Sequence, residues 1–308
     1  MSRPRNLKIR PLRERRNLVK KQDFAKVPPR LLGFRGWFES LPEIYGAVHL
    51  KKRVGAVVAA RKAGRPVGVA LGAHVLKVGL SPLLIDLMRK GVITHVATNG
   101  ASAIHDYETA LIGETSEDVG TGLKDGSFGF WAETFEGLRS AATRARDRQQ
   151  GYGLALGELI NERALPHREL SVFAEAARLR IPATIHVAFG CDIVHMDPEL
   201  DGGALGDATL RDFWVLAETV AGLDGGVWLN IGSAVIMPEV FLKAVSIARN
   251  QGRLKTDFIT GNFDMMHQYR ALTNVTDRPP KEGYSVICQH EILLPLFREA
   301  VLAYLDGA

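Results

Sequence analysis

The sequence predicts an α/β protein with a mostly parallel β-sheet and helices on both of its faces. Short runs rich in valine and isoleucine alternate with segments of helical periodicity along most of the chain. This alternation is typical of βαβ units, which place parallel strands side by side and helices over them. With 46% apolar and 24% charged residues, the 308-residue chain has the composition of a globular protein rather than of a disordered or disulfide-stabilised one. The expected architecture is a Rossmann-like, doubly wound sheet.

Several apolar runs are expected to form the strands of this sheet. They are PVGVALG (66–72), ITHVATNG (93–100), ATIHVAFG (183–190), VWLNIG (227–232), DFITGN (257–262) and YSVICQ (284–289). The segments expected to be helical are 47–63, 81–91, 102–113, 129–150, 152–164, 167–180, 210–223, 235–251 and 290–305. The helix over 81–91 has the clearest ends, because Ser81 can cap it, Pro82 suits its first turn and Gly91 ends it.

Charge divides the chain into a basic N-terminal arm, residues 1–36, and an acidic α/β domain, residues 37–308. The arm carries 12 Lys/Arg and 2 Asp/Glu, a net charge of +10, whereas the domain carries 27 and 32, a net charge of −5. One interpretation is that the arm binds nucleic-acid phosphates; the other is that it wraps over an acidic neighbouring subunit or is simply mobile. No aromatic-interleaved surface or zinc pattern follows the arm, so nucleic-acid binding is not expected.

Neither membrane insertion nor secretion is expected from the sequence. The apolar runs are strand-sized, well short of the ~20 residues of a membrane-spanning helix. The basic N-terminus is not followed by the apolar segment of a secretory signal. Cys191 and Cys288 are too few for a disulfide framework and suit a reducing compartment. We therefore expect a cytoplasmic protein.

The segments that follow the expected strands hold most of the candidate functional residues. In open parallel sheets, ligands bind beyond the carboxyl ends of the strands. Five of the nine histidines fall there: His74, His105, His195, His267 and His290. This placement predicts a binding or catalytic site at that edge of the sheet.

The segment TNGASAIHDYE (98–108) is the strongest candidate for catalysis. Its glycine turn lets the backbone approach a ligand, and the helix that follows offers free N–H groups to a phosphate. His105 and Glu108 are three residues apart and therefore share a helix face. We expect His105 to carry a proton, with Asp106 or Glu108 orienting it. The alternative is that Asp106 and Glu108 only favour the start of the helix electrostatically.

Other well-known site patterns are missing from the chain. It has no GxGxxG fingerprint, no Walker loop and no GxSxG elbow. His186, Cys191 and His195 are spaced H-x4-C-x3-H, but a fourth ligand is not evident and the spacing fits no standard zinc finger. No metal is expected.

The segments at the strand ends resemble the deoxyhypusine synthase family. GAHVLKVG (72–79), THVATNGASAIHDYE (94–108), GSAVIMPEVF (232–241), FITGNFDMM (258–266) and CQHEILLPLFREAVLAYL (288–305) follow the order and spacing of that family's strand-end segments. NGASAIHDYE also resembles the Asn-Ala-x-Ala-x-His-Asp-x-Glu string of archaeal ornithine cyclodeaminases, matching it at His105, Asp106 and Glu108. The resemblance implies a Rossmann-like domain that binds NAD and assembles as a homotetramer.

One departure from the family argues against deoxyhypusine synthesis itself. The family forms an imine on the lysine of a Trp-Gly-Lys motif, and none of the four tryptophans here precedes Gly-Lys. The corresponding interval, ALTNVTDRPPKEGYS (271–285), holds Lys281 as its only lysine. Whether Lys281 replaces the missing nucleophile is left open by the sequence.

The resulting hypothesis is a NAD-dependent enzyme acting on a small amine or amino acid by oxidation to an imine, followed by deamination, cyclisation or transfer. The residues expected to bind the cofactor are Gly72, Ala73, His74, Thr98, Asn99, Gly100, Gly232, Ser233 and Asp264. The residues expected to contact the substrate are Asp192, His195, Glu239 and His267. The alternative is a non-catalytic ligand-binding or regulatory homo-oligomer of the same fold.

Overall fold

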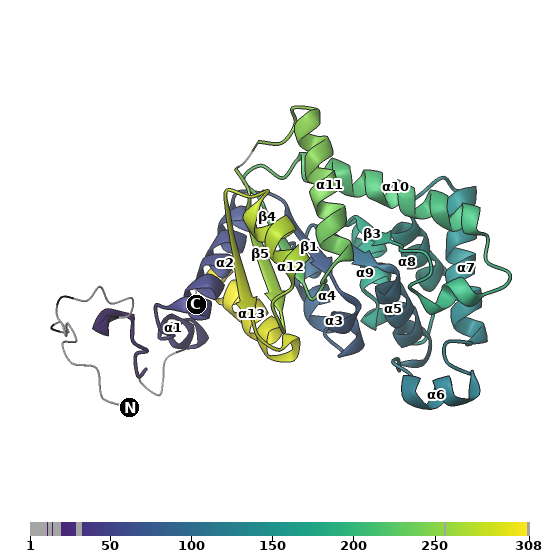
Figure 1. Ribbon diagram of the computed structural model, residues 1–308, viewed down its shortest axis with the longest axis horizontal. Coiled ribbons are helices and arrows are strands. Elements are labelled where there is room, and N and C mark those ends of the chain that lie inside the picture. Colours follow the sequence, from purple (N-terminus) through teal and green to yellow (C-terminus); the bar gives the residue numbers. More distant parts are fainter. Residues whose placement is uncertain (1–10, 12–13, 15–19, 29–32, 256, 307–308) are drawn as a thin grey trace, which may run out of the picture.

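A parallel six-stranded sheet forms the centre of the computed structural model, which describes residues 11, 14, 20–28, 33–255 and 257–306 (Figure 1). Its strands are β1 (Val67–Leu71), β2 (His95–Asn99), β3 (Ala183–His186), β4 (Val227–Ile231), β5 (Ile259–Asp264) and β6 (Glu282–Ile287). The strand order is β3-β2-β1-β4-β5-β6, and every neighbouring pair is parallel. This order is that of a doubly wound Rossmann sheet, so the predicted fold class is confirmed.

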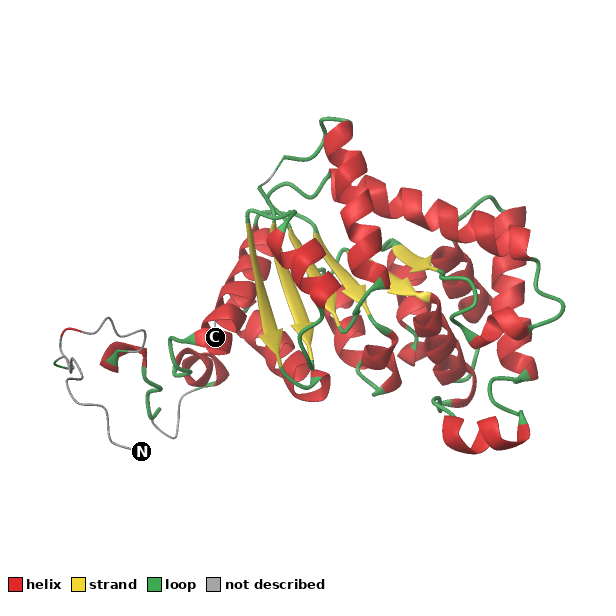
Figure 2. Cartoon of the chain, viewed as in Figure 1, coloured by secondary structure: helices red, strands yellow, loops and turns green. Residues whose placement is uncertain are grey.

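Helices precede or follow each strand (Figure 2). They are α1 (Phe34–Glu39), α2 (Tyr45–Lys62), α3 (Ala73–Lys77), α4 (Ser81–Arg89), α5 (Gly100–Ile112), α6 (Val119–Asp125), α7 (Ala132–Asp147), α8 (Tyr152–Glu162), α9 (Val172–Leu179), α10 (Gly202–Ala221), α11 (Ile236–Asn250), α12 (Tyr269–Ala271) and α13 (His290–Leu305). Shorter turns are η2 (Lys21–Asp23), η3 (Arg168–Leu170), η4 (Ile193–Met196) and the π-helical η5 (Leu272–Asp277). Each helix expected from the sequence is present, whereas the short helices α1, α3, α6 and α12 were not anticipated.

Two apolar layers hold the helices on the sheet. Alternating side chains of β1 and β4 pack under α2, α4, α9 and α13 on one face and under α10 and α11 on the other. On the second face, Trp228 stacks on Phe241 with ring centroids 4.8 Å apart. A side chain at Gly68 would collide with the Trp228 ring, so glycine is needed in β1 for the tryptophan to fit.

The direction of chain winding reverses between β1 and β4, which are neighbours in the sheet although β2 and β3 come between them in sequence. Gly72 follows β1 and donates its N–H to the carbonyl of Ile231 at 2.8 Å. Gly232 follows β4 with a φ of +69°, a conformation that favours glycine. A side chain at Gly72 would collide with the Gly232 carbonyl, so the two glycine turns pack directly on each other. This switch point is where Rossmann-like sheets bind their ligands.

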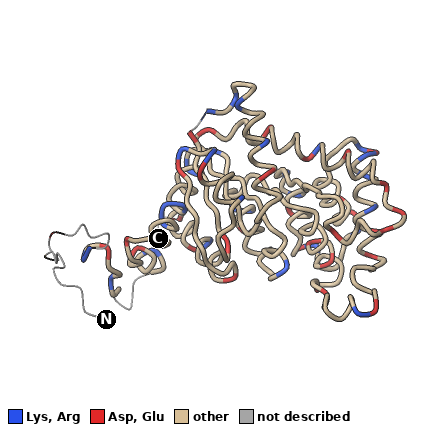
Figure 3. The backbone as a smooth tube through the Cα atoms, viewed as in Figure 1, with Lys and Arg blue, Asp and Glu red and all other residues tan. Residues whose placement is uncertain are grey.

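Two strands lie at other positions than predicted, and one predicted segment lies mostly outside the described residues. The last two strands lie two residues away from their expected positions, so Phe263 and Asp264 belong to β5. Most of the basic arm, residues 1–36, lies outside the described residues, and its boundary stays a prediction. Over the rest of the chain, acidic and basic residues are interspersed along the backbone (Figure 3). Among the described residues, no helix is both long and apolar enough to cross a membrane.

Candidate functional site

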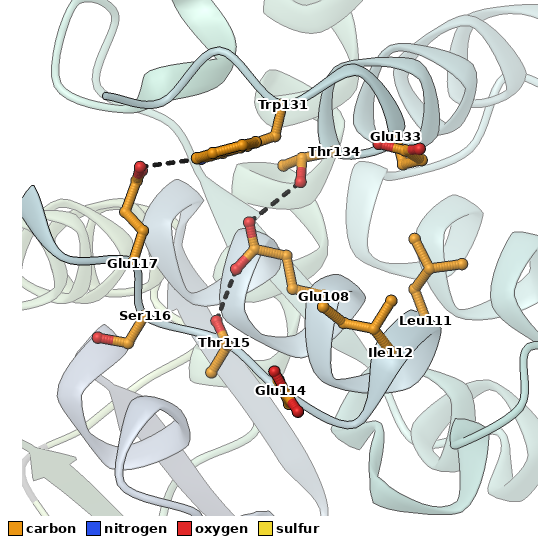
Figure 4. A pocket seen from close by; sticks show the side chains of 10 residues that line it. All are labelled: Glu108, Leu111, Ile112, Glu114, Thr115, Ser116, Glu117, Trp131, Glu133 and Thr134. Carbon is orange, nitrogen blue, oxygen red and sulfur yellow. Dashed lines mark hydrogen bonds between the residues drawn. The ribbon is translucent and has the colours of Figure 1, made fainter. Parts of the chain in front are cut away.

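Two neighbouring cavities lie along helix α5 and share the lining residues Glu108, Ser116 and Glu117. The smaller, which we call the His105 cavity, has a volume of about 210 Å³. It is lined by Lys77, Ala101, Ile104, His105, Glu108, Ser116, Glu117, Val119, Phe128, Cys191, Asp192 and Ile193. The larger, which we call the acidic cavity, has a volume of about 560 Å³ (Figure 4). It is lined by Glu108, Leu111, Ile112, Glu114, Thr115, Ser116, Glu117, Trp131, Glu133 and Thr134.

His105 and Glu108 are joined by the hydroxyl of Thr115. Nδ1 of His105 lies 2.7 Å from Thr115 Oγ1, and that hydroxyl donates to Glu108 Oε2 at 2.6 Å. A second hydroxyl, that of Thr134, donates to Glu108 Oε1 at 3.0 Å. Because the single Thr115 proton points to the carboxylate, Nδ1 of His105 must carry a proton and donate it to Thr115. Nε2 of a neutral His105 is then an acceptor.

Burial keeps His105 neutral. Burial, followed by the charges of Lys77 and His74, lowers its pKa from 6.5 to about 4. Burial also raises the pKa of Glu108, although the hydroxyls of Thr115 and Thr134 oppose this effect. At neutral pH the histidine therefore presents an uncharged acceptor nitrogen rather than a cation.

Asp106, expected as a possible partner of His105, serves another purpose. Its side chain is buried and accepts hydrogen bonds from the Ser171 hydroxyl and from the Val172 N–H, the latter at 2.7 Å. It therefore fixes the first turn of α9 against α5. Since these bonds lie on the side of α5 away from both cavities, Glu108 is the carboxylate that orients His105, and Asp106 is not.

Asp192 brings a second carboxylate into the His105 cavity. Its Oδ2 lies against the α-carbon of Gly100, and any side chain at Gly100 would collide with it. Burial raises the pKa of Asp192 from 3.8 to about 6. The carboxylate thus faces the start of α5, where the glycine turn predicted a phosphate, and it would repel an anion there.

His195 supports the loop that carries Asp192. Its Nδ1 accepts the backbone N–H groups of Gly190 at 3.1 Å and Asp192 at 3.2 Å, and its ring stacks on Phe189. Burial lowers its pKa. His195 does not line the His105 cavity, so its expected contact with substrate would have to be indirect.

Two other residues expected to bind substrate lie elsewhere. Glu239 accepts hydrogen bonds from Lys243, Arg270 and Asn274, and these interactions, led by Lys243, lower its pKa. A carboxylate already neutralised in this way is a poor partner for another ammonium group. His267 is exposed in the loop after β5. Neither residue lines the His105 cavity.

The residues expected to bind a dinucleotide are divided between two places. Thr98 is buried and donates to the Thr184 carbonyl, and Asn99 caps α5 by accepting from Ser102. These two side chains hold the turn between β2 and α5 in place. The others lie around the switch point, where Asp264 ends β5 and the remaining residues follow β1 or β4: Gly72, Ala73, His74, Gly232 and Ser233.

His290 also lies at the switch point, although the sequence did not single it out as a cofactor or substrate contact. It is buried at the start of α13, 5.7 Å from the His74 ring, and its Nε2 donates to the Phe263 carbonyl at 3.3 Å. Its Nδ1 has no partner among the described residues. The signal was present in the sequence, since His290 is one of the histidines that follow a strand.

Lys281 cannot stand in for a nucleophilic lysine at this site. It precedes β6 and therefore lies at the opposite edge of the parallel sheet from the switch point. Its side chain is 68% exposed and pairs with Asp257 at 2.8 Å, which raises its pKa and keeps it protonated. The lysine that does line the His105 cavity is Lys77, three residues after His74. Within the described residues, no group of three or more His, Cys, Asp or Glu side chains is placed to hold a metal ion.

Comparison with known proteins identifies the fold but not a family. No family model matches the sequence, and no curated protein matches it. A conserved putative LOR/SDH protein from Methanococcus maripaludis S2 matches in structure with a TM-score of 0.54 and 16% identity, over 84% of this chain and 70% of that one. AgrE in complex with ornithine and NAD+ matches with a TM-score of 0.53 and 16% identity, over 84% of this chain and 33% of AgrE.

A putative deoxyhypusine synthase from Entamoeba histolytica matches over more of its length. Its TM-score is 0.52 at 11% identity, covering 89% of this chain and 94% of that one. The resemblance to deoxyhypusine synthase-like proteins is thereby confirmed at the level of the fold. The chain spans only a third of AgrE, so nothing about the whole of that protein follows from the match.

Proposed function

We propose that this protein is a NAD-dependent enzyme acting on a small amino acid or amine, with a diamino acid such as ornithine as the first candidate. The observation that carries the proposal is the His105–Thr115–Glu108 chain opening into a cavity that also holds Lys77 and Asp192. AgrE, which shares the fold, was crystallised with ornithine and NAD+. A cytoplasmic homotetramer is part of the same proposal.

The charges of the His105 cavity complement a diamino acid. Lys77 offers one cation to a carboxylate, while Asp192 and Glu117 offer carboxylates to ammonium groups. The volume of about 210 Å³ is below the roughly 300–1,000 Å³ of pockets for drug-sized ligands. The cavity is therefore suited to a small metabolite, and a dinucleotide would have to extend away from it.

The switch point fits the remainder of a dinucleotide. The glycine turns at Gly72 and Gly232 bring the ends of β1 and β4 into direct contact, and Gly232 stays partly exposed there. The buried Nδ1 of His290, beside Gly232, has no partner among the described residues. We assign cofactor binding to Gly72–His74, Gly232, Ser233 and Asp264, rather than to the start of α5 that Asp192 faces. When bound, NAD would accept the hydride from the carbon that carries the amine.

The protein's own groups would prepare that carbon by removing a proton from the ammonium. Asp192, whose pKa is raised to about 6, is better matched to this task than His105, whose pKa is lowered to about 4. We therefore assign proton acceptance to Asp192. His105 would accept a hydrogen bond at Nε2 and fix the direction of the amine.

The test is a calorimetric titration of cofactor-stripped protein with NAD, NADP and ornithine, followed by absorbance assay of NADH formation. We expect dinucleotide binding, and ornithine binding at least tenfold weaker in Asp192→Asn and His105→Ala than in the matched exposed variant Glu199→Gln. Failure of both dinucleotides to bind at millimolar concentration would overturn the proposal.

The position of Lys281 favours a second candidate, a ligand-binding or regulatory protein of the same fold that lacks turnover. In that case NAD and the amino acid bind, but no NADH or ammonia appears. His105→Ala would then change affinity alone.

A further inference from the structure

The acidic cavity holds four carboxylates and no compensating cation. Glu108, Glu114, Glu117 and Glu133 line it, and none of its lining residues is Lys or Arg. Among the described residues, none of the four glutamates forms an ion pair. One turn along α7 from Glu133, by contrast, Glu136 is paired with Arg163 at 2.7 Å. Glu114 and Glu133 are exposed, whereas Glu108 and Glu117 are partly buried, and no cationic side chain among the described residues pairs with any of the four.

An aromatic ring and two aliphatic side chains complete the walls of this cavity. The indole N–H of Trp131 donates to Glu117 Oε2 at 2.9 Å, which fixes the ring beside the carboxylates (Figure 4). Leu111 and Ile112 supply an apolar wall near Glu108. Carboxylates next to a fixed indole form a setting that favours organic cations over hydrated metal ions, because the ring and the apolar wall contact carbon.

We propose that the acidic cavity is a second binding site, for a small organic cation with an alkyl stem and an amine or guanidinium end, distinct from the site for the substrate. The carboxylates would hold the cationic end. The faces of Trp131, Leu111 and Ile112 would cover the stem.

Occupancy of this site would act on His105 through a shared residue. Glu108 lines both cavities and holds the Thr115 hydroxyl that contacts Nδ1 of His105. A cation beside Glu108 stabilises its ionised form, so the Thr115 proton stays directed at Glu108 and His105 keeps its Nδ1–H tautomer. The bound cation would thus hold the histidine in the form that presents Nε2 as an acceptor. This second step rests on the proposed function, whereas the binding step does not.

The binding step is tested by calorimetry on the full chain without cofactor, using agmatine and putrescine as probes and 1-butanol as an uncharged control. We expect both cations to bind and the alcohol not to bind. Glu133→Gln and Trp131→Ala line only the acidic cavity and should each weaken binding about tenfold or more. Glu169→Gln, an exposed glutamate outside both cavities, should leave it unchanged. No binding at millimolar concentration, or equal weakening by Glu169→Gln, would overturn the site.

The two sites can be separated with Asp192→Asn, which lies in the His105 cavity alone. Agmatine affinity that survives this substitution and falls in Glu133→Gln places the cation in the acidic cavity, even if dinucleotide binding fails. The reverse pattern places it in the His105 cavity and overturns the inference. Coupling is measured by the NMR chemical shifts of the His105 ring, which should change when agmatine is added to wild type but not to Glu133→Gln.

Discussion

The two sides of helix α5 carry similar carboxylic acids with different roles. Asp106 faces α9, where the Ser171 hydroxyl and a backbone N–H hold it; Glu108 faces the cavities, where two threonine hydroxyls hold it. Burial raises the pKa of both. Residues two apart lie about 200° from each other around a helix, so neighbours in sequence serve opposite surfaces. The comparison shows that a perturbed acid is a functional candidate only when its hydrogen bonds leave it facing a cavity.

The largest expected loss of stability comes from removing Asp106, on the side of α5 that packs against α9. Asp106→Ala leaves the Val172 N–H and the Ser171 hydroxyl buried without their partner, which should lower the free energy of unfolding by about 2–4 kcal/mol. Glu108→Ala should cost less than about 1 kcal/mol, because the threonine hydroxyls it leaves can turn to water in the open cavity. Urea denaturation measures both. Equal losses in the two variants would remove the distinction between the sides.

The next largest effect is the pH dependence of stability that Asp106 produces. Burial raises the pKa of Asp106 from 3.8 to about 7, so the folded chain keeps a proton that the unfolded chain releases. The stabilising contribution is therefore complete below about pH 4 and is lost as pH rises toward 7, by at most about 1.4 kcal/mol per pH unit. Asp106→Asn has no such titration. Its stability relative to that of the wild type should therefore rise as the pH increases from about 4 to 7. Denaturation at several pH values tests this, and a constant gap would contradict it.

The sequence was sufficient for the sheet because its central strands are buried on both faces. β1 is a continuous apolar run and β4 is apolar except for Asn230, and both were placed to within a residue, whereas β5 and β6 were displaced by two. β6, at the edge, is only partly buried, and polar residues interrupt its pattern. Helices as short as α3 and α6 give too few turns for helical periodicity to be visible.

The relative placement of candidate residues could be predicted where helix spacing alone determines it, while their roles stay predictions. His105 and Glu108 share a helix face as expected, and Asp192 reaches the same cavity from the end of β3. Thr115, which joins the first two, lies in a loop whose path no sequence pattern specifies. The acidic cavity could not be predicted for the same reason. Its lining residues are spread over positions 108–134 and come together only because the chain folds back between α6 and α7.

The smallest expected effect extends the comparison to α7, where Glu133 and Glu136 differ by one turn. Glu136 is paired with Arg163 at 2.7 Å and accepts from Ser140, whereas Glu133 faces the other carboxylates of the acidic cavity. Glu136→Gln should therefore lower stability by less than about 1 kcal/mol, as expected for a partly exposed pair.

Glu133→Gln should instead leave stability nearly unchanged or raise it slightly, because the repulsion between like charges that it removes offsets the favourable interaction of Glu133 with the first turn of α7. Any gain should vanish at about 1 M salt, where the screening length falls to about 3 Å, while the loss in Glu136→Gln should shrink under the same conditions. Thermal melting of both variants at low and high salt measures these differences. A loss in Glu133→Gln that persists at high salt would mean that Glu133 is held by the protein itself, and the carboxylates of the acidic cavity would then belong with Asp106 as structural groups.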